Sequence, residues 1–247
     1  MRNIKLTIEY DGKDFNGWQK QPDKLNIQGT IENAIEQITG EKIELNASGR
    51  TDAGVHAIGQ VANFKTNSKL PINKFAIAIN SKLKKSIRIT KAEEVEESFH
   101  SRLSCKKKTY RYVINNSKYG TAIYRNLETL IPYKLDVIKM QNAAKYFEGE
   151  HDFKAFKASG TSSKSSVRTI YSAKVIDAGN EKIYIELTGN GFLYNMVRII
   201  SGTLVDVGCG KIKPEEIKNI IESKKRNLAG KTLPPQGLYL VNVEYEN

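Results

Sequence analysis

The sequence is poor in the residues that build disulfide frameworks and metal sites. Its 247 residues include two cysteines, Cys105 and Cys209, and three scattered histidines, His56, His100 and His151. Two cysteines cannot form a disulfide framework, and neither residue type shows the spacing of metal ligands. The shortage predicts a protein without a bound metal, in a reducing, cytoplasmic setting.

Long apolar runs are also missing. No stretch approaches the roughly 18–20 apolar residues that a membrane-spanning helix requires. The N-terminus starts at once with an alternating strand pattern and lacks the apolar segment of a signal peptide. With 39% hydrophobic residues and a mean hydropathy of -0.48, the chain has the composition of a soluble globular protein. Its length suits one large domain or two small ones.

Acidic side chains are in deficit. The chain carries 39 Lys and Arg against 27 Asp and Glu, a formal net charge of +12. Residues 1–103 hold 16 basic and 13 acidic side chains, and the remainder holds 23 and 14, so the net charges are +3 and +9. A positive surface attracts polyanions such as nucleic acids. A lysine-rich composition alone gives the same excess, so charge does not decide the partner.

Hydrophobic periodicity predicts an α+β fold. Alternating patterns indicate strands, helical spacing of apolar residues indicates helices, and half-polar strands favour antiparallel sheets covered on one face. We expect two α+β halves, residues 1–104 and 105–247, with a loop in the Ser-rich segment 157–168. Strands are expected at 4–10, 43–47, 58–64, 86–95, 107–114, 168–177, 182–188 and 237–245, and helices at 31–38, after Pro71, at 137–147, at 191–207 and after Pro214.

The familiar catalytic motifs of hydrolases and redox enzymes are absent from the sequence. Gly189 and Gly191 follow a strand pattern as in a dinucleotide-binding fingerprint, but Tyr194 occupies the third glycine position. No G-x-S-x-G segment and no reactive-cysteine arrangement is present. The sequence therefore predicts no nucleotide cofactor.

The segment GRTDAGVHA (49–57) places one carboxylate, Asp52, between Thr51 and a glycine-containing turn. Aspartate often caps turns by accepting backbone N–H bonds, and T-D-A-G is good turn sequence. A desolvated carboxylate beside an arginine can instead stay ionised and act as a nucleophile or base. The residues alone leave both interpretations open.

Several segments, in order along the chain, resemble the tRNA pseudouridine synthase A family. GRTDAGVHA followed by IGQVANF is similar to the active-site segment of that family. The opening YDGKDFNGWQKQ (10–21) resembles another of its segments. Further matches are IQGTIENAI (27–35), KKKTYRYVI (106–114), GEHDFKAF (149–156), GNGFLYNMVRIISGTLVDVG (189–208) and PPQGLYLVNVEY (234–245).

The resemblance implies a function and a fold. It implies isomerisation of uridine to pseudouridine in the anticodon stem-loop of tRNA, at tRNA positions 38, 39 and 40, without a cofactor. The implied pseudouridine-synthase fold has two α+β halves whose antiparallel sheets join into one central sheet, with the active-site cleft between them. Members of the family are homodimers, so we expect tRNA to contact both subunits.

The resemblance also assigns site residues. Asp52 is implied as the nucleophile, attacking either ribose C1′ or uracil C6, and Tyr110 as the residue that stacks on the base. Arg198 is implied as the cation that pairs with Asp52. Arg50 is implied to fill the gap left when the target nucleotide flips out of the helix. Two alternatives are a tRNA-binding protein that has lost catalysis and a Mg²⁺-dependent enzyme that transfers a phosphoryl group through Asp52.

Overall fold

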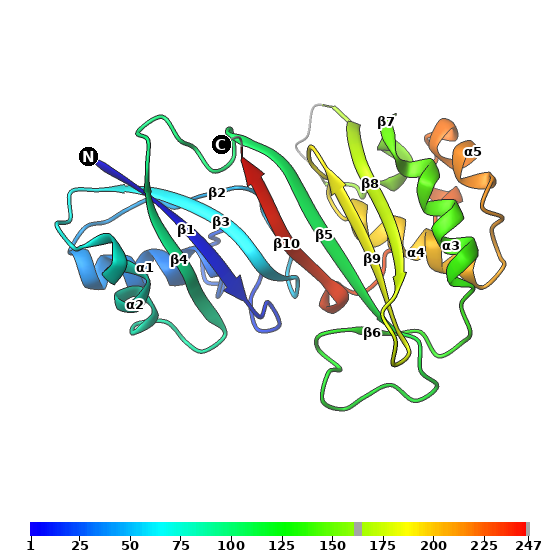
Figure 1. Cartoon of the computed structure of the whole chain (residues 1–247), viewed down its shortest axis with the longest axis horizontal. Coiled ribbons are helices and arrows are strands. Elements are labelled where there is room, and N and C mark those ends of the chain that lie inside the picture. Colours follow the sequence, from blue (N-terminus) through cyan, green and yellow to red (C-terminus); the bar gives the residue numbers. More distant parts are fainter. Residues whose placement is uncertain (161–164, 246–247) are drawn as a thin grey trace. The chain divides into compact units, whose positions relative to one another are not determined.

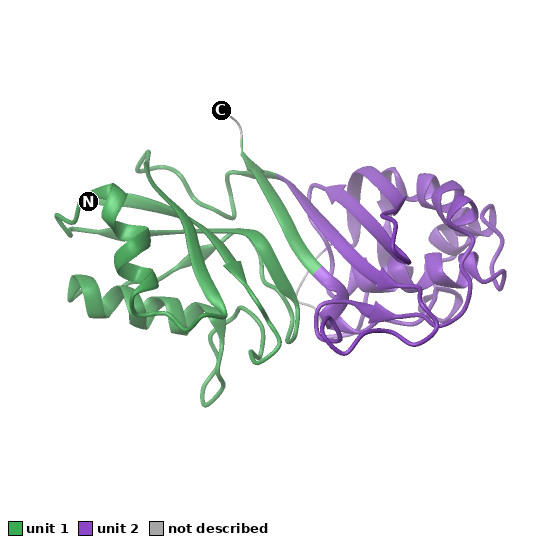
Figure 2. Ribbon diagram, turned by 60° about the horizontal axis from the view of Figure 1, so that its bottom comes forward, with its two compact units in different colours: residues 1–106, 239–247 green, residues 107–238 purple. Residues whose placement is uncertain are grey.

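The chain folds into two compact units. The computed structural model describes residues 1–160 and 165–245, so part of the loop expected at 157–168 lies outside the described residues. Unit 1 comprises Met1–Lys106 and Tyr239–Asn247, and unit 2 comprises Lys107–Leu238 (Figure 2). Both units mix helices and strands, and most strand pairs are antiparallel. The predicted α+β class is confirmed.

Unit 1 is a sheet with two helices on it (Figure 1). Along the sheet the order is β4-β1-β3-β10, and β2 pairs with β3. Strand β1 is antiparallel to both of its neighbours, whereas β3 and β10 run parallel through the pairs His56↔Tyr239 and Ala57↔Leu240. The bounds are β1 (Arg2–Tyr10), α1 (Ile27–Thr39), β2 (Asn46–Ala47), β3 (His56–Thr66), α2 (Ile72–Asn80), β4 (Ile87–Val95) and β10 (Leu238–Tyr245).

The core of unit 1 follows from the periods in its sequence. Ile4, Leu6 and Ile8 alternate along β1 and are fully buried, as are Ile31 and Ile35 at helical spacing on α1. Asn26 caps α1 by accepting a bond from the Gly29 N–H, and Gly40 ends the helix in the left-handed conformation. These buried side chains and helix caps hold β1 and α1 in place, and the segments that connect them lie between fixed ends.

Unit 2 is an antiparallel sheet of order β5-β9-β8-β7, with β6 parallel to β5. Its helices lie on one face of the sheet (Figure 1). The bounds are β5 (Cys105–Asn115), β6 (Thr129–Leu130), α3 (Val137–Ala144), η1 (Lys145–Phe147), β7 (Gly149–Asp152), η2 (Phe153–Phe156), β8 (Val167–Asp177), β9 (Lys182–Gly189), α4 (Met196–Gly208), α5 (Glu216–Ser223), η3 (Arg226–Leu228) and η4 (Pro235–Gly237).

Helix α4 is the buried centre of unit 2. Eleven of its 13 residues are buried, which explains the apolar run in the sequence. The helix begins at Met196 rather than at residue 191, because Asn195 takes a left-handed φ of 60° and ends the preceding turn. A Cβ on Gly202 would lie 1.9 Å from the Lys231 carbonyl oxygen, so this glycine allows the segment before β10 to cross the helix. No helix in the described ranges has the length and apolarity of a membrane span.

Candidate active site

Asp52 lies in a tight loop of unit 1 that connects β2 to β3. The Val55 N–H donates to the Asp52 carbonyl oxygen at 3.1 Å and closes the turn. Gly54 supplies the positive φ of 76° that the turn requires. Thr51 is buried, Asp52 is half-buried and Arg50 is exposed. The loop therefore presents its carboxylate at the surface of the unit, with the threonine beside it anchored in the interior.

The Asp52 loop is held by residues from the segment 10–18. The Trp18 N–H donates to the Thr51 carbonyl oxygen at 3.0 Å, and the Gly54 N–H donates to that of Phe15 at 3.4 Å. The hydroxyl groups of Tyr10 and Thr51 share a buried hydrogen bond of 2.7 Å. Because bonds hold the loop on both sides of Asp52, they fix the backbone that carries the carboxylate.

Gly17 allows the two segments to touch. It has a φ of +81°, and a Cβ placed on it would lie 2.5 Å from the Thr51 carbonyl oxygen and 3.0 Å from the Asp52 carbonyl carbon. No larger residue fits without moving the backbone of the Asp52 loop. The opening segment 10–21 and the segment GRTDAGVHA are thus in direct contact, although about 30 residues separate them in the sequence.

Buried polar groups support the loop from below. The Gln60 side chain donates to the Gly49 carbonyl oxygen at 2.9 Å and accepts from the Ser48 hydroxyl at 2.7 Å. Burial raises the pKa of Tyr10, and its hydrogen bonds to Thr51 and Gln60 only partly oppose that effect, so its hydroxyl stays protonated. Sequence reasoning missed Tyr10, Gly17 and Gln60 as loop supports. The signal that could have indicated them is that all three lie in segments that resemble the family.

His56 connects the end of the loop to two other elements. It is 1% exposed, and its Nδ1 accepts a hydrogen bond of 3.0 Å from the Gly12 N–H. The ring stacks on Tyr239 of β10, with centroids 4.9 Å apart. Because Nδ1 accepts this bond, the ring proton of the neutral form sits on Nε2. The Asp11 carboxylate lies 3.2 Å from Nδ1. His56 is therefore a buried histidine that connects the end of the loop to Gly12 and to β10.

Tyr110 and Tyr112 of β5 have different surroundings in unit 2. Tyr110 is 8% exposed and packs edge-on against Phe192 at a centroid distance of 5.1 Å. Tyr112 is fully buried, and its hydroxyl bonds Thr129 Oγ1 at 2.6 Å and the Pro234 carbonyl oxygen at 2.7 Å. Burial raises the pKa of Tyr112, and the positive charge of Arg198 opposes this shift only in part. Tyr112 is a core residue, whereas Tyr110 keeps a small exposed fraction.

Arg198 is a half-buried residue of α4 rather than an ordinary surface arginine. Its Nε donates to the Leu233 carbonyl oxygen at 2.7 Å, and its Nη1 donates to Asn195 Oδ1 at 2.6 Å. These bonds fix the guanidinium between the start of the helix and the segment that leads to β10. Its pairing with Asp52 would join two units and stays a prediction.

Metal ligands do not gather in the part of the chain that the structure describes. No group of three or more His, Cys, Asp or Glu in residues 1–160 and 165–245 is placed to hold a metal ion. Cys105 and Cys209 form no disulfide with each other, and both are half-buried. The arrangement around Asp52 instead offers a single carboxylate on a rigid loop, which suits acid–base or nucleophilic chemistry.

Comparison with known proteins identifies the family. A family model described as tRNA pseudouridine synthase matches residues 6–103 and 143–246. The chain belongs to the tRNA pseudouridine synthase family. The match includes the whole Asp52 loop and the helix that carries Arg198, so the predicted family is confirmed.

Individual members of the tRNA pseudouridine synthase family are similar over the full chain. The tRNA pseudouridine synthase A of Caldicellulosiruptor bescii is 56% identical over 245 residues, which are 99% of this chain and 100% of that protein. That of Acetivibrio thermocellus is 52% identical with the same coverage. A crystal structure of an archaeal box H/ACA ribonucleoprotein complex aligns with a TM-score of 0.39 at 10% identity, over 91% of this chain and 59% of that chain.

Proposed function

We propose that this chain converts uridine to pseudouridine in the anticodon stem-loop of tRNA, with Asp52 as the reacting carboxylate. The observation that carries the proposal is the Asp52 loop, whose backbone is held at Thr51 and Gly54 by the segment 10–18. Gly17 meets the same loop where no Cβ would fit, so the backbone on both sides of Asp52 is held in one position. A rigid backbone places a reacting group without an entropic cost at the moment of reaction.

The reaction requires one carboxylate as its reacting group. The C1′–N1 glycosidic bond breaks, the uracil turns, and a new bond forms from C1′ to C5. The C5 proton then leaves to water and N1 takes up a proton, so the product is an isomer of the substrate. No electrons are gained or lost and no water is consumed, so the reaction requires neither a redox cofactor nor a metal. Asp52 attacks ribose C1′ or uracil C6, and the bond that it forms breaks again before the product leaves, which restores the carboxylate. In either case the carboxylate must be ionised and free of its proton.

The remaining site residues take roles that their surroundings support. Tyr110, with its edge against Phe192 and a small exposed fraction, suits stacking on the uracil. Arg198, held by Leu233 and Asn195, suits a fixed positive charge that keeps Asp52 ionised. Arg50 is exposed and two residues from Asp52, which suits a side chain that replaces the flipped nucleotide.

The proposal extends to the assembly and the substrate positions. The protein acts in the cytoplasm as a homodimer in which one tRNA contacts both subunits, and its targets are tRNA positions 38, 39 and 40. The net charge of +12 supports a polyanionic substrate. Light scattering of the protein with and without tRNA, and mapping of pseudouridine in the product, test these points separately.

Release of tritium tests the reaction. Transfer RNA labelled with tritium at uracil C5 is incubated with the protein in EDTA, and the tritium released to water is counted. The wild type and Asp23→Asn, which removes an exposed carboxylate outside the loop, should release it. Asp52→Asn should release none while binding tRNA nearly as well, because affinity rests mostly on phosphate contacts. Turnover of Asp52→Asn within tenfold of the wild type would reject Asp52 as the reacting group.

A further inference from the structure

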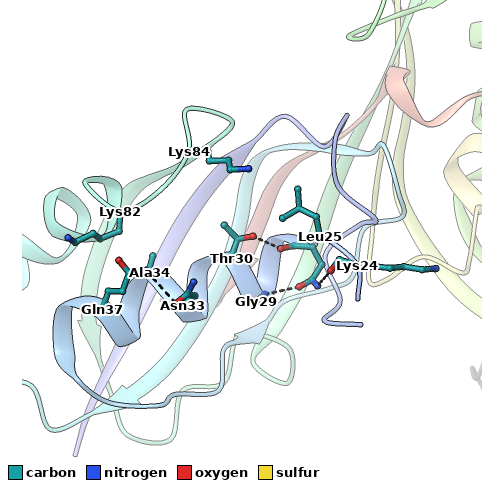
Figure 3. A pocket seen from close by; sticks show the side chains of 10 residues that line it. Lys24, Leu25, Gly29, Thr30, Asn33, Ala34, Gln37, Lys82 and Lys84 are labelled. Atoms are coloured by element: carbon teal, nitrogen blue, oxygen red, sulfur yellow. Dashed lines mark hydrogen bonds between the residues drawn. The ribbon is translucent and has the colours of Figure 1, made fainter. Parts of the chain in front are cut away.

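An open groove on unit 1 is lined by basic side chains (Figure 3). It has a volume of about 370 Å³. Lys24 approaches it from the segment before α1, and Lys82 and Lys84 approach it from the turn after α2. Its lining, all of it within the described residues, includes no Asp or Glu. The groove therefore concentrates positive charge along the exposed side of α1.

The lysines of the groove are not neutralised by neighbours. All three side chains are exposed, and no ion pair formed within the described residues involves any of them. Lys82 and Lys84 begin a run, 82–88, that holds four cations and no acid. A basic surface without counter-charges is suited to an anionic partner.

Both walls of the groove are tied to the segment that holds the Asp52 loop. On the α1 side, the N–H groups of Ile27 and Gln28 donate to the carbonyl oxygens of Gly17 and Trp18 at 3.2 and 3.0 Å. On the other side, the Asp11 N–H donates to the Ser86 carbonyl oxygen at 2.9 Å. The segment 11–18 thus contacts the groove walls and the Asp52 loop alike, and all three belong to unit 1.

We propose that this groove binds the sugar–phosphate backbone of the substrate tRNA outside the reacting nucleotide. The proposal rests on the function proposed above. Lysines supply point charges for phosphates. The Asn33 side chain supplies amide N–H groups for phosphate and ribose oxygens, whereas the Thr30 hydroxyl already donates to the Asn26 carbonyl oxygen and Gln37 donates to Asn33 Oδ1.

The composition of the groove favours RNA over an acidic peptide. Leu25, which is 43% exposed, is the single large apolar side chain among the groove residues, which are all described. Peptide grooves normally provide several apolar anchors, whereas phosphate-binding surfaces are polar and positively charged. An acidic peptide is the alternative occupant that the experiment must separate.

The test compares two triple variants with equal loss of charge. One replaces the groove lysines (Lys24→Gln, Lys82→Gln, Lys84→Gln), and the control replaces three exposed lysines of unit 1 outside the groove (Lys42→Gln, Lys69→Gln, Lys74→Gln). The dissociation constant for tRNA is measured between 50 and 200 mM salt, in the Asp52→Asn background. The slope of log affinity against log salt should fall by about 2 units for the groove variant, since each lost phosphate contact contributes about 0.7–0.9.

The affinity for tRNA should differ between the two variants as clearly as the salt slope does. At low salt the groove variant should bind tRNA about 10- to 100-fold more weakly than the control variant. Thermal unfolding of both variants checks that folding is retained. Equal slopes for the two variants, or an unchanged slope for the groove variant, would overturn the proposal.

Binding of polyglutamate distinguishes an acidic peptide from tRNA as the occupant of the groove, and tritium release tests the proposed function separately. If the groove variant keeps its tRNA affinity but loses binding to polyglutamate, the groove is a peptide site and the proposal is overturned. Binding is measured without turnover. Failure of the wild type to release tritium would therefore reject the enzymatic function, while the salt slopes would still decide whether RNA occupies the groove.

Discussion

Replacing Gly17 by alanine should damage catalysis through the Asp52 loop. The new Cβ would lie 2.5 Å from the Thr51 carbonyl oxygen, where ordinary contacts begin at 3.4 Å. The loop must therefore shift by about 1 Å, and a misplacement of about 1 Å at a reacting group can cost about 100-fold in rate. The left-handed φ of +81° adds a stability cost of about 1–2 kcal/mol for a residue with a Cβ.

Gly40→Ala provides a matched control for the backbone cost. Gly40 ends α1 with a φ of +73°, and nothing lies within 4 Å of the position of its Cβ. Alanine there meets the same conformational penalty without touching the Asp52 loop. Gly40→Ala should lose about 1–2 kcal/mol in the free energy of unfolding, and Gly17→Ala should lose more, because its Cβ also meets the Thr51 carbonyl oxygen. Only Gly17→Ala should lose turnover.

The assay combines three measurements on each variant. Urea titration gives the free energy of unfolding, tritium release at saturating tRNA gives kcat, and filter binding gives the affinity for tRNA. The expected result for Gly17→Ala is a kcat lower by about 100-fold with folding and tRNA affinity largely retained. Equal kcat values for Gly17→Ala and Gly40→Ala would refute the idea that close approach at Gly17 positions Asp52.

Three further outcomes are expected. Arg50→Ala should lower turnover by orders of magnitude with little change in tRNA affinity. A substrate with a mispaired target uridine should regain part of the lost turnover, because such a base costs less to extrude. Equal losses on paired and mispaired substrates would contradict a role of Arg50 in flipping. Tyr112→Phe should lower the free energy of unfolding by about 1–3 kcal/mol in urea titration, because its buried hydroxyl bonds two oxygens; an unchanged midpoint would contradict it. A hydrogen bond from Ser166, then one from Lys224, lowers the pKa of Asp152. The stability difference between wild type and Asp152→Asn should therefore be full at pH 7 and shrink as pH falls through this lowered folded pKa; a difference that does not shrink on acidification would contradict this origin.

Periodic patterns allowed much of the secondary structure to be predicted. The strand around Ile4, Leu6 and Ile8 and the helix around Ile31 and Ile35 were predicted because a period of two or of 3.6 is a local property of the sequence. Ordered motifs then indicated the family, which the comparisons confirmed. The roles of Asp52, Arg50, Tyr110 and Arg198 rest on that resemblance and stay predictions.

Other features depended on contacts between distant residues. The distinction between Tyr110 and Tyr112 on one strand required the hydroxyl partners of Tyr112, which come from Thr129 and Pro234. The expected strand 43–47 shortens to Asn46–Ala47, where it pairs with β3. A strand pattern predicts that a segment is extended, but pairing partners set its length.

The chain by itself determined the alternation of its strands and helices, its positive charge and the motifs that mark its family. Tertiary structure decided how Gly17 meets Thr51, how His56 joins Gly12 to Tyr239, and how β10 returns to pair with β3. Periodicity records only which side of an element is buried. The position of the Asp52 carboxylate depends on backbone contacts between segments more than 30 residues apart, and only the folded chain brings these together.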